Sequence, residues 1–403
     1  EREISTTMAF VRCLSLLLRD KNIKERIVPI LCDEGRTFGM EGLFRQLGIY
    51  SHQGQQYEPE DSDQLMFYKE SKDGQVLQEG ITEAGAMSSW IAAATSYANY
   101  NIPMIPFYIY YSMFGHQRIG DLCWAAGDMR AKGFLLGGTA GRTTLNGEGL
   151  QHQDGHSHLI ASTVANCVSY DPTYAHEVAV IIQSGLERMY GNNEDVYFYL
   201  TLMNENYSHP EMTEGQEAGI LKGMYQLKTV GNSKVKAQLL GSGTILREAE
   251  KAADMLAKDF KVSSDIWSVT SFTELKRDGQ SAQRQNRLNA HLLIDNEKGQ
   301  TSYVEDCLKG AKGPVIAATD YTHDFAEQIR PWVPGEYTTL GTDGFGRSDT
   351  REQLRSFFEV DAKMIVYTAL KALMDQGDYA KDDLLRAMAT LNIDSNRPDP
   401  WTV

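Results

Sequence analysis

Short apolar runs alternate with segments of helical periodicity along the first half of the chain. Residues 27–31 form a continuous apolar run, which predicts a buried strand, and residues 6–18 show helical spacing behind Ser5, a residue type that caps helices. The alternation continues with strands at 76–77, 102–111, 134–136, 164–169 and 195–202, and with helices at 84–94, 112–132 and 174–190. Strands separated by helices favour a parallel sheet with helices on both faces.

A polar stretch around Pro210, residues 204–217, predicts a linker, and a second alternation follows it. Strands are expected at 235–240, 264–269, 314–318 and 337–340, and helices at 245–260, 272–291, 321–330, 350–357, 360–376 and 380–391. The pattern therefore predicts an α/β protein of two consecutive doubly wound domains with mainly parallel sheets. We place these domains at residues 1–205 and 206–403.

Composition restricts the classes of function. The chain has 403 residues, 42% of them apolar, and a formal net charge of −15, which argues against non-specific binding to nucleic acid or to an anionic membrane. The five cysteines are scattered, and no apolar run is long enough to span a bilayer, so we expect a cytoplasmic protein. Because residues 1–5 lack an initiator Met and a signal-peptide pattern, we also expect the sequence to be part of a longer chain.

Residues 74–87 hold the first candidate for chemistry. Glu83 follows a predicted strand and opens a helix that is rich in small apolar residues. Burial at such a junction makes ionisation costly, so the carboxyl group can hold or share a proton near neutral pH. The alternative is a first-turn glutamate that only favours the helix dipole, and the stretch by itself leaves both interpretations open.

Two acidic residues follow the strand at 27–31. Asp33 and Glu34 stand at the edge where open parallel sheets bind ligands, although turn chemistry is an alternative. Residues 35–72 are polar and predict a long ordered excursion over the surface or across a subunit interface.

The loop at 137–158 combines many glycines with His152, His156 and His158. Glycines at this density indicate positive φ angles or close approach to a ligand. Three histidines raise the alternative of a zinc site, but no set of Cys or carboxylate residues completes one. Proton transfer by one of the histidines is favoured.

Five segments together carry a resemblance to a known family: residues 77–87, 108–118, 141–152, 268–274 and 341–349. Through them the chain resembles the thiamine-diphosphate enzymes of the transketolase type, and more narrowly the homodimeric bacterial pyruvate dehydrogenase branch. The resemblance covers essentially the whole chain as the middle, pyrimidine-binding domain and the C-terminal domain. Transketolases usually carry Arg-Glu-His where this chain has Thr82-Glu83-Ala84, which favours the pyruvate dehydrogenase branch.

The resemblance implies roles for the candidate residues. Glu83 would hydrogen-bond the cofactor's aminopyrimidine ring nitrogen, and Phe114 would stack on that ring. Cofactor contacts are implied for Glu83, Phe114, Asp33, Ile81 and Glu148. Catalytic roles are implied for Glu83, His152, Tyr111 and Glu34. For His152, which we expect in a flexible loop, the implied step is acyl transfer to a lipoyl group; bracing of the loop is the alternative.

The half of the site that binds the diphosphate is not evident. In this family the magnesium motif begins with Gly-Asp-Gly and ends in Asn, and no Gly-Asp-Gly occurs here. The resemblance therefore implies thiamine diphosphate together with Mg²⁺ that is bound mainly by a region absent from this chain, and no metal ligand within it. It also implies a second subunit of a homodimer, with the interface at loops 35–60 and 112–152.

The implied function is oxidative decarboxylation of pyruvate with acetyl transfer to a lipoyl-bearing dihydrolipoyl acetyltransferase. The chain would supply the pyrimidine half of the site and would not turn over alone. Two alternatives remain: a transketolase-like transferase of 2-oxoacids or sugar phosphates, and a non-catalytic assembly fragment.

Overall fold

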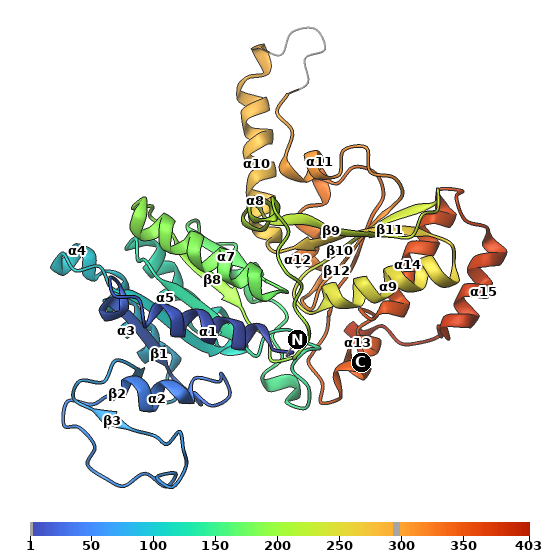
Figure 1. The fold of residues 1–403 in the computed structure, drawn as a ribbon. Coiled ribbons are helices and arrows are strands. Elements are labelled where there is room, and N and C mark those ends of the chain that lie inside the picture. The colour runs from blue at the N-terminus through green and yellow to red at the C-terminus, as the bar shows by residue number, and fades with distance from the viewer. Residues whose placement is uncertain (1–2, 293–298) are drawn as a thin grey trace. The chain divides into compact units, whose positions relative to one another are not determined.

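The computed structural model describes residues 3–292 and 299–403, so the first two residues of the segment 1–5 lie outside it (Figure 1). The chain divides into two compact units. Unit 1 contains the chain up to Ala140 together with Ser157–Ser169 and Tyr174–Glu211, and unit 2 contains Gly141–His156, Tyr170–Thr173 and Met212–Val403. Residues 141–156 of the glycine-rich loop thus belong to unit 2 and its two ends to unit 1, while a domain boundary between residues 205 and 206 stays a prediction.

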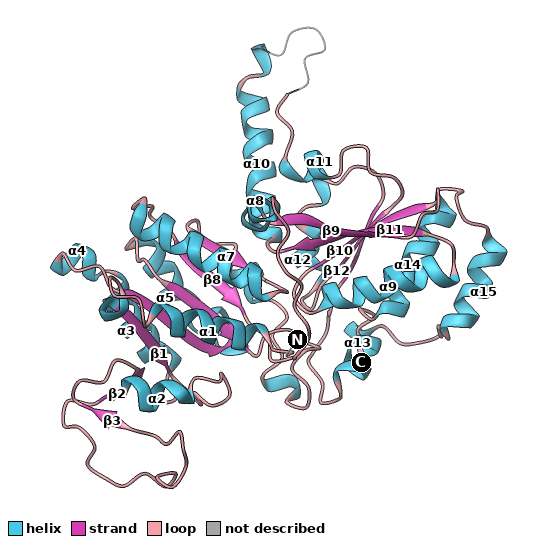
Figure 2. Ribbon diagram, viewed as in Figure 1, coloured by secondary structure: helices cyan, strands magenta, loops and turns pink. Residues whose placement is uncertain are grey.

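Unit 1 is built on a six-stranded sheet (Figure 2). Its strands are β1 (Ile27–Leu31), β4 (Leu77–Gln78), β5 (Ile105–Tyr111), β6 (Phe134–Gly138), β7 (Cys167–Tyr170) and β8 (Tyr197–Thr201). They lie in the order β4-β1-β5-β6-β8-β7, and the pairs β4–β1, β1–β5, β5–β6 and β6–β8 are parallel. A separate parallel pair consists of β2 (Ile49–Tyr50) and β3 (Glu70–Ser71).

Helices cover both faces of this sheet. The helical elements of unit 1 are α1 (Thr6–Leu17), η1 (Lys24–Arg26), α2 (Glu41–Leu47), α3 (Glu83–Ala94), α4 (Ser96–Tyr100), η2 (Ser112–Phe114), α5 (His116–Asp128), α6 (Ser157–Ala161), α7 (Ala175–Leu186) and η4 (Glu187–Gly191). Successive strand residues face opposite sides. Tyr108 therefore packs in the cluster with Trp90 of α3 and Cys123 of α5, whereas the ring of Phe107 lies 6.0 Å from that of Phe10 on α1.

Unit 2 contains a five-stranded sheet in the order β13-β12-β10-β11-β9. The strands are β9 (Met224–Val230), β10 (Lys236–Gly241), β11 (Ser263–Val269), β12 (Val315–Ala318) and β13 (Tyr337–Leu340). Its helical elements are η3 (Gly149–Gln151), α8 (Gln216–Lys222), α9 (Ile245–Asp259), α10 (Phe272–Leu288), η5 (Ala290–Leu292), α11 (Tyr303–Cys307), α12 (His323–Glu327), η6 (Arg330–Trp332), α13 (Arg351–Phe357), α14 (Ala362–Asp375), α15 (Lys381–Leu391) and η7 (Pro400–Thr402). All pairings are parallel except β11–β9, which is antiparallel. The predicted class, α/β with mainly parallel sheets, is confirmed.

Three local predictions need correction. The strand β9 and the helix α8 were not predicted, because β9 is an edge strand whose second half carries Gln226, Lys228 and Thr229. The stretch predicted as a linker is partly packed, since Tyr207 is 3% exposed and pairs through its backbone with Ile4. The predicted excursion at 35–72 is not only surface, because it contains α2 and a fully buried Phe38.

Candidate functional site

Glu83 is the first residue of α3, just beyond the carboxyl end of β4 at the edge of the sheet of unit 1. Thr82 caps this helix by accepting a hydrogen bond from the Gly85 amide, 3.2 Å away, so the helix start is fixed. The Tyr108 hydroxyl donates to the Glu83 carbonyl oxygen at 3.3 Å. Although it stands at a helix terminus, Glu83 is only 6% exposed. The predicted buried carboxylate is therefore present.

Arg118 of α5 is the partner of this carboxylate. Its Nη1 lies 2.9 Å from Glu83 Oε2, and its guanidinium carbon lies 4.3 Å from the centre of the Phe114 ring. The arginine thus compensates a buried charge on one side and stacks on an aromatic ring on the other. Arg118 ends the segment 108–118 that carries the resemblance, but the sequence alone predicts no role for it. The ion pair forms only because α3 packs against α5.

Tyr111, at the end of β5, connects this group to the acidic residues. Its hydroxyl donates to Glu34 Oε2 at 3.0 Å and lies 3.2 Å from Thr37 Oγ1, while its ring centre is 6.4 Å from that of Phe114. Burial, together with the hydrogen bond to Glu34 and its charge, raises the pKa of Tyr111 to about 12. The phenol is therefore protonated at neutral pH and can act as a hydrogen-bond donor.

Asp33, Glu34 and Ile81 line one cavity of about 540 Å³ at the carboxyl end of β1. The other lining residues are Gly35, Arg36, Thr37, Phe44, Tyr68 and Gln78. Ile81 presents an apolar side chain that is 79% exposed. These contacts and this cavity therefore join all the predicted site residues of unit 1 into one continuous group.

Glu148 and His152 form a separate pair in unit 2. His152 Nδ1 lies 3.3 Å from Glu148 Oε2 across the short helix η3, and the histidine side chain is 22% exposed. An exposed carboxylate next to an imidazole can orient the ring. By the resemblance, Glu148 would line the same cavity as Asp33 and Glu34, and His152 would face the substrate side. Both placements stay predictions.

The other two histidines of the loop have local partners. His158 belongs to α6 of unit 1, is 1% exposed and lies 2.8 Å from the Thr201 hydroxyl. The His156 amide donates to Asp154 at 3.0 Å in unit 2. In the part of the chain that the structure describes, no three His, Cys, Asp or Glu side chains form a group that could hold a metal ion.

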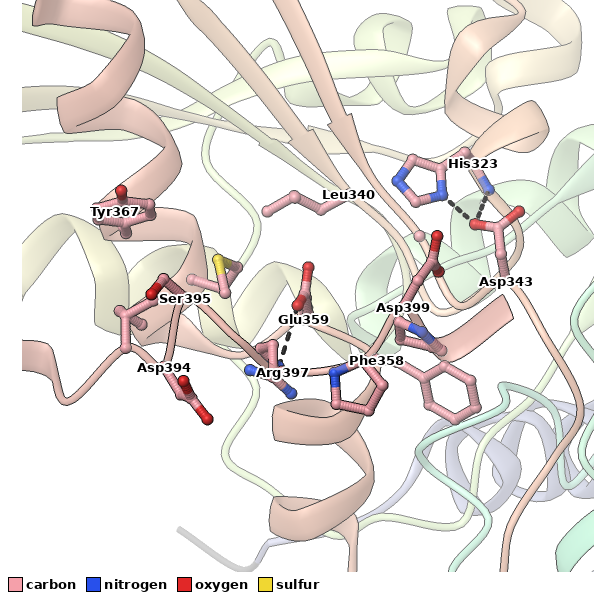
Figure 3. Close-up of a pocket in the computed structure, with 15 residues that line it drawn as sticks. His323, Leu340, Asp343, Phe358, Glu359, Tyr367, Asp394, Ser395, Arg397 and Asp399 are labelled. Atoms are coloured by element: carbon pink, nitrogen blue, oxygen red, sulfur yellow. Dashed lines mark hydrogen bonds and ion pairs between the residues drawn. The ribbon is translucent and has the colours of Figure 1, made fainter. Parts of the chain in front are cut away.

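A cavity of unit 2, of about 510 Å³, lies beyond the ends of β12 and β13 (Figure 3). His323 pairs there with Asp343, and Arg397 Nε lies 3.1 Å from Glu359 Oε1. Burial lowers the pKa of His323, but the hydrogen bond to Asp343 and its negative charge outweigh burial and raise it above its usual value. None of the candidate site residues predicted from the sequence lines this cavity.

No helix among the described residues is long and apolar enough to cross a membrane.

Comparison with known proteins identifies relatives of both parts of the chain. The family model for the pyruvate dehydrogenase E1 component middle domain matches residues 1–210, and the model for the transketolase-like C-terminal domain matches residues 223–361. The pyruvate dehydrogenase E1 component of Cupriavidus necator is 63% identical over 404 residues, which is 100% of this chain and 45% of that protein. The protein of the same name from Escherichia coli K12 is 60% identical over 401 residues, 99% of this chain and 44% of that protein.

A solved structure supports the same fold. Transketolase from Campylobacter jejuni has a TM-score of 0.66 at 17% identity, and the match covers 92% of this chain and 47% of that one. This likeness concerns the fold alone. The chain spans about 45% of the length of the curated relatives that it matches.

Proposed function

The chain belongs to the pyruvate dehydrogenase E1 component family, and from this membership we propose that it is part of an enzyme that oxidatively decarboxylates pyruvate with thiamine diphosphate. The acetyl group passes to a lipoyl group of a partner dihydrolipoyl acetyltransferase. This activity is proposed for the complete protein, of which the chain supplies the pyrimidine half of the site. Thr82-Glu83-Ala84 in place of the transketolase triplet supports pyruvate rather than a sugar phosphate as substrate.

The observation that carries this proposal is the buried Glu83 next to the Arg118–Phe114 stack. A desolvated carboxyl group and an aromatic face fit the two needs of an aminopyrimidine, a hydrogen bond at its ring nitrogen and stacking on its plane. Glu83 would bind that nitrogen, Phe114 would lie against the ring, and Ile81 would contact an apolar edge. When bound, the cofactor supplies a nucleophilic carbon and an electron sink.

The chain's own residues then orient the reactants and move protons. Glu83 would share a proton with the ring nitrogen that it binds, and Arg118 would balance the charge of the carboxylate when that proton is on the ring. Tyr111 keeps its phenolic proton and is oriented by Glu34, so it can donate a hydrogen bond to the carboxylate of pyruvate. In unit 2, the imidazole of His152 can donate a proton to a dithiolane sulfur as the lipoyl ring opens, oriented by Glu148.

The groups that bind Mg²⁺ and the diphosphate, and the second subunit, would lie outside this chain. We infer that Mg²⁺ and the diphosphate are bound mainly by the portion of the relatives that the chain does not span. A second subunit completes each site, in a cytoplasmic homodimer. Sedimentation of the full-length protein tests this point, because a stable monomer would contradict the dimer.

The function is tested with the full-length enzyme that contains this chain. We expect pyruvate-dependent reduction of an artificial electron acceptor, and acetylation of lipoyl domains when the acetyltransferase is added. Turnover of sugar phosphates without turnover of pyruvate would support a transketolase-like transferase instead. Absence of thiamine diphosphate binding to the full-length protein would indicate a non-catalytic assembly role.

A further inference from the structure

The sheet of unit 2 contains a topological switch point. After β10 the chain runs to β11 on one side, and after β12 it runs to β13 on the other, although β10 and β12 are neighbours. In open α/β sheets, the crevice outside the carboxyl ends of two such strands is the usual ligand-binding position. Here the two turns that border it are residues 242–244 after β10 and residues 319–322 after β12.

This crevice contains the protein's own loop. Thr144 Oγ1, from the segment Gly141–His156, lies 2.5 Å from Thr244 Oγ1 in the first turn and 2.5 Å from Asp320 Oδ2 in the second. The Thr144 hydroxyl therefore bridges both sides of the switch point. It lies outside the carboxyl ends of β10 and β12, the position at which open α/β sheets usually bind ligands.

Asp320 is the centre of this attachment and is fully buried. Its Oδ1 accepts from the Thr143 amide at 2.8 Å and from the Thr143 hydroxyl at 2.7 Å. Its Oδ2 accepts from the Thr144 amide at 3.2 Å and from the Thr144 hydroxyl. A buried carboxylate is costly unless it is hydrogen-bonded, and two adjacent threonines supply four donors.

The approach of the loop requires glycine next to the threonines. Gly141 has a φ of +85°, and a Cβ atom there would lie 2.2 Å from Asp320 Oδ2. Any other residue would therefore clash with the carboxylate as well as strain the backbone. The glycine, the two threonines and the aspartate form one fitted arrangement.

The far end of the loop is attached independently. Gln153 Oε1 accepts from the Arg347 amide at 2.7 Å, and its Nε2 donates to the Leu145 carbonyl at 2.6 Å. At the near end, next to Thr143, the buried Arg142 donates to the carbonyls of Thr342 and Gly344, each 2.6 Å away. Between the threonines and Gln153, residues 145–152 form a short arc that carries Glu148 and His152, and the Gly147 amide of this arc donates to the Asp349 carbonyl at 3.1 Å.

We propose that Asp320 is a positioning residue that fixes this arc, so that the ligand crevice of the second sheet holds a loop of the same chain in place of a ligand. Asp320 touches neither Glu148 nor His152 and acts on them through Thr143 and Thr144. The expected effect on acetyl transfer rests on the proposed function, whereas the attachment of the arc to Asp320 through Thr143 and Thr144 does not.

Amide hydrogen exchange in the full-length protein tests the attachment. In the first variant, Asp320→Asn, an amide NH₂ replaces one carboxylate oxygen and faces two hydrogen-bond donors. The second, Thr143→Val/Thr144→Val, removes both hydroxyls at nearly constant volume. Exchange in residues 143–152 should rise at least about tenfold, because lost buried hydrogen bonds lower the free energy of local opening. Thr143→Ser/Thr144→Ser should restore protection, and Asp254→Asn, an exposed carboxylate of α9, is the matched control.

Kinetics test the positioning role. The valine variant should lower kcat for lipoyl acetylation about tenfold, with the artificial-acceptor rate within about twofold of wild type, since misplacement of a transfer group affects only its own step. Equal loss in both assays, or unchanged exchange in a folded valine variant, would overturn the proposal. Increased exchange with normal acetylation would also refute the positioning role. If the wild-type protein acetylates no lipoyl group, the proposed function fails. The exchange measurements still test whether Asp320 holds Thr143 and Thr144 in place.

Discussion

Arg118 Nη1 lies 2.9 Å from Glu83 Oε2, and this contact joins the start of α3 to α5. The glutamate is 8% exposed at its side chain and the arginine 52%. A half-exposed arginine therefore balances the charge of a nearly buried carboxylate. The same guanidinium packs on Phe114, so charge balance and ring orientation depend on one side chain.

Replacing Glu83 should abolish most of the activity. In the full-length enzyme, Glu83→Gln should reduce pyruvate turnover by about 10²-fold or more, the scale of a lost acid–base contribution. Folding should be little affected, which circular dichroism checks. Glu79→Gln, which changes a half-buried carboxylate four residues earlier, should retain activity. Near-normal turnover of Glu83→Gln at saturating cofactor would remove Glu83 from its assigned role.

The ion pair between Glu83 and Arg118 should be measurable as a coupling free energy between the two residues. A double-mutant cycle of Glu83→Gln and Arg118→Met, followed by thermal unfolding, should give a coupling free energy of about 1 kcal/mol, because one partner is buried and the other half-exposed. Arg118→Met alone should destabilise more than Arg118→Met in the Glu83→Gln background, since it leaves a buried carboxylate without its cation. Additive effects would show that the pair contributes no net stability.

His152 should act later than Glu83. His152→Ala should lower acetylation of lipoyl domains by at least about tenfold and leave the artificial-acceptor rate nearly unchanged, because loss of a proton donor slows only the step it serves. His156→Ala is the control within the same loop. Equal loss in both assays would place His152 in substrate binding or in the shared first step. No loss in either would leave only the bracing role.

The His323–Asp343 pair should make stability depend on pH. The pKa of His323 is raised in the folded protein. Its contribution to the free energy of unfolding is therefore complete below pH 6.5 and is lost as pH rises through its folded pKa. The pKa of Asp343 is lowered, because the hydrogen bond and charge of His323 outweigh the effect of burial. The carboxylate's contribution is therefore present above pH 3.8 and is lost as pH falls through its folded pKa.

His323→Gln should accordingly destabilise the full-length protein by up to about 1 kcal/mol near pH 6, and by less near pH 9, as expected for a partly exposed pair. Thermal midpoints at both pH values measure this difference. His291→Gln, an exposed histidine of the same unit, provides the baseline. A pH-independent effect of His323→Gln would contradict the assignment.

Local sequence patterns determined the main elements of the fold. The apolar run at 27–31 is the strand β1, residues 337–340 are β13, and Ser5 caps α1 by accepting from the Met8 amide. These features depend on periodicity and capping between near neighbours, which a sequence displays directly. The motif residues Glu83, Phe114, Tyr111 and Glu34 were also identified from the sequence, although their catalytic roles stay predictions.

Only the tertiary structure decided which side chains meet. Arg118 pairs with a residue 35 positions earlier, and Asp320 binds Thr143 across 177 positions. The glycine loop, which we expected to be flexible, is fixed at both ends by such contacts. The polar edge strand β9 likewise forms because β11 offers it a partner. Hydrogen bonds between residues far apart in the chain leave no periodic signal in the sequence, because they depend on how packed elements bring distant groups together.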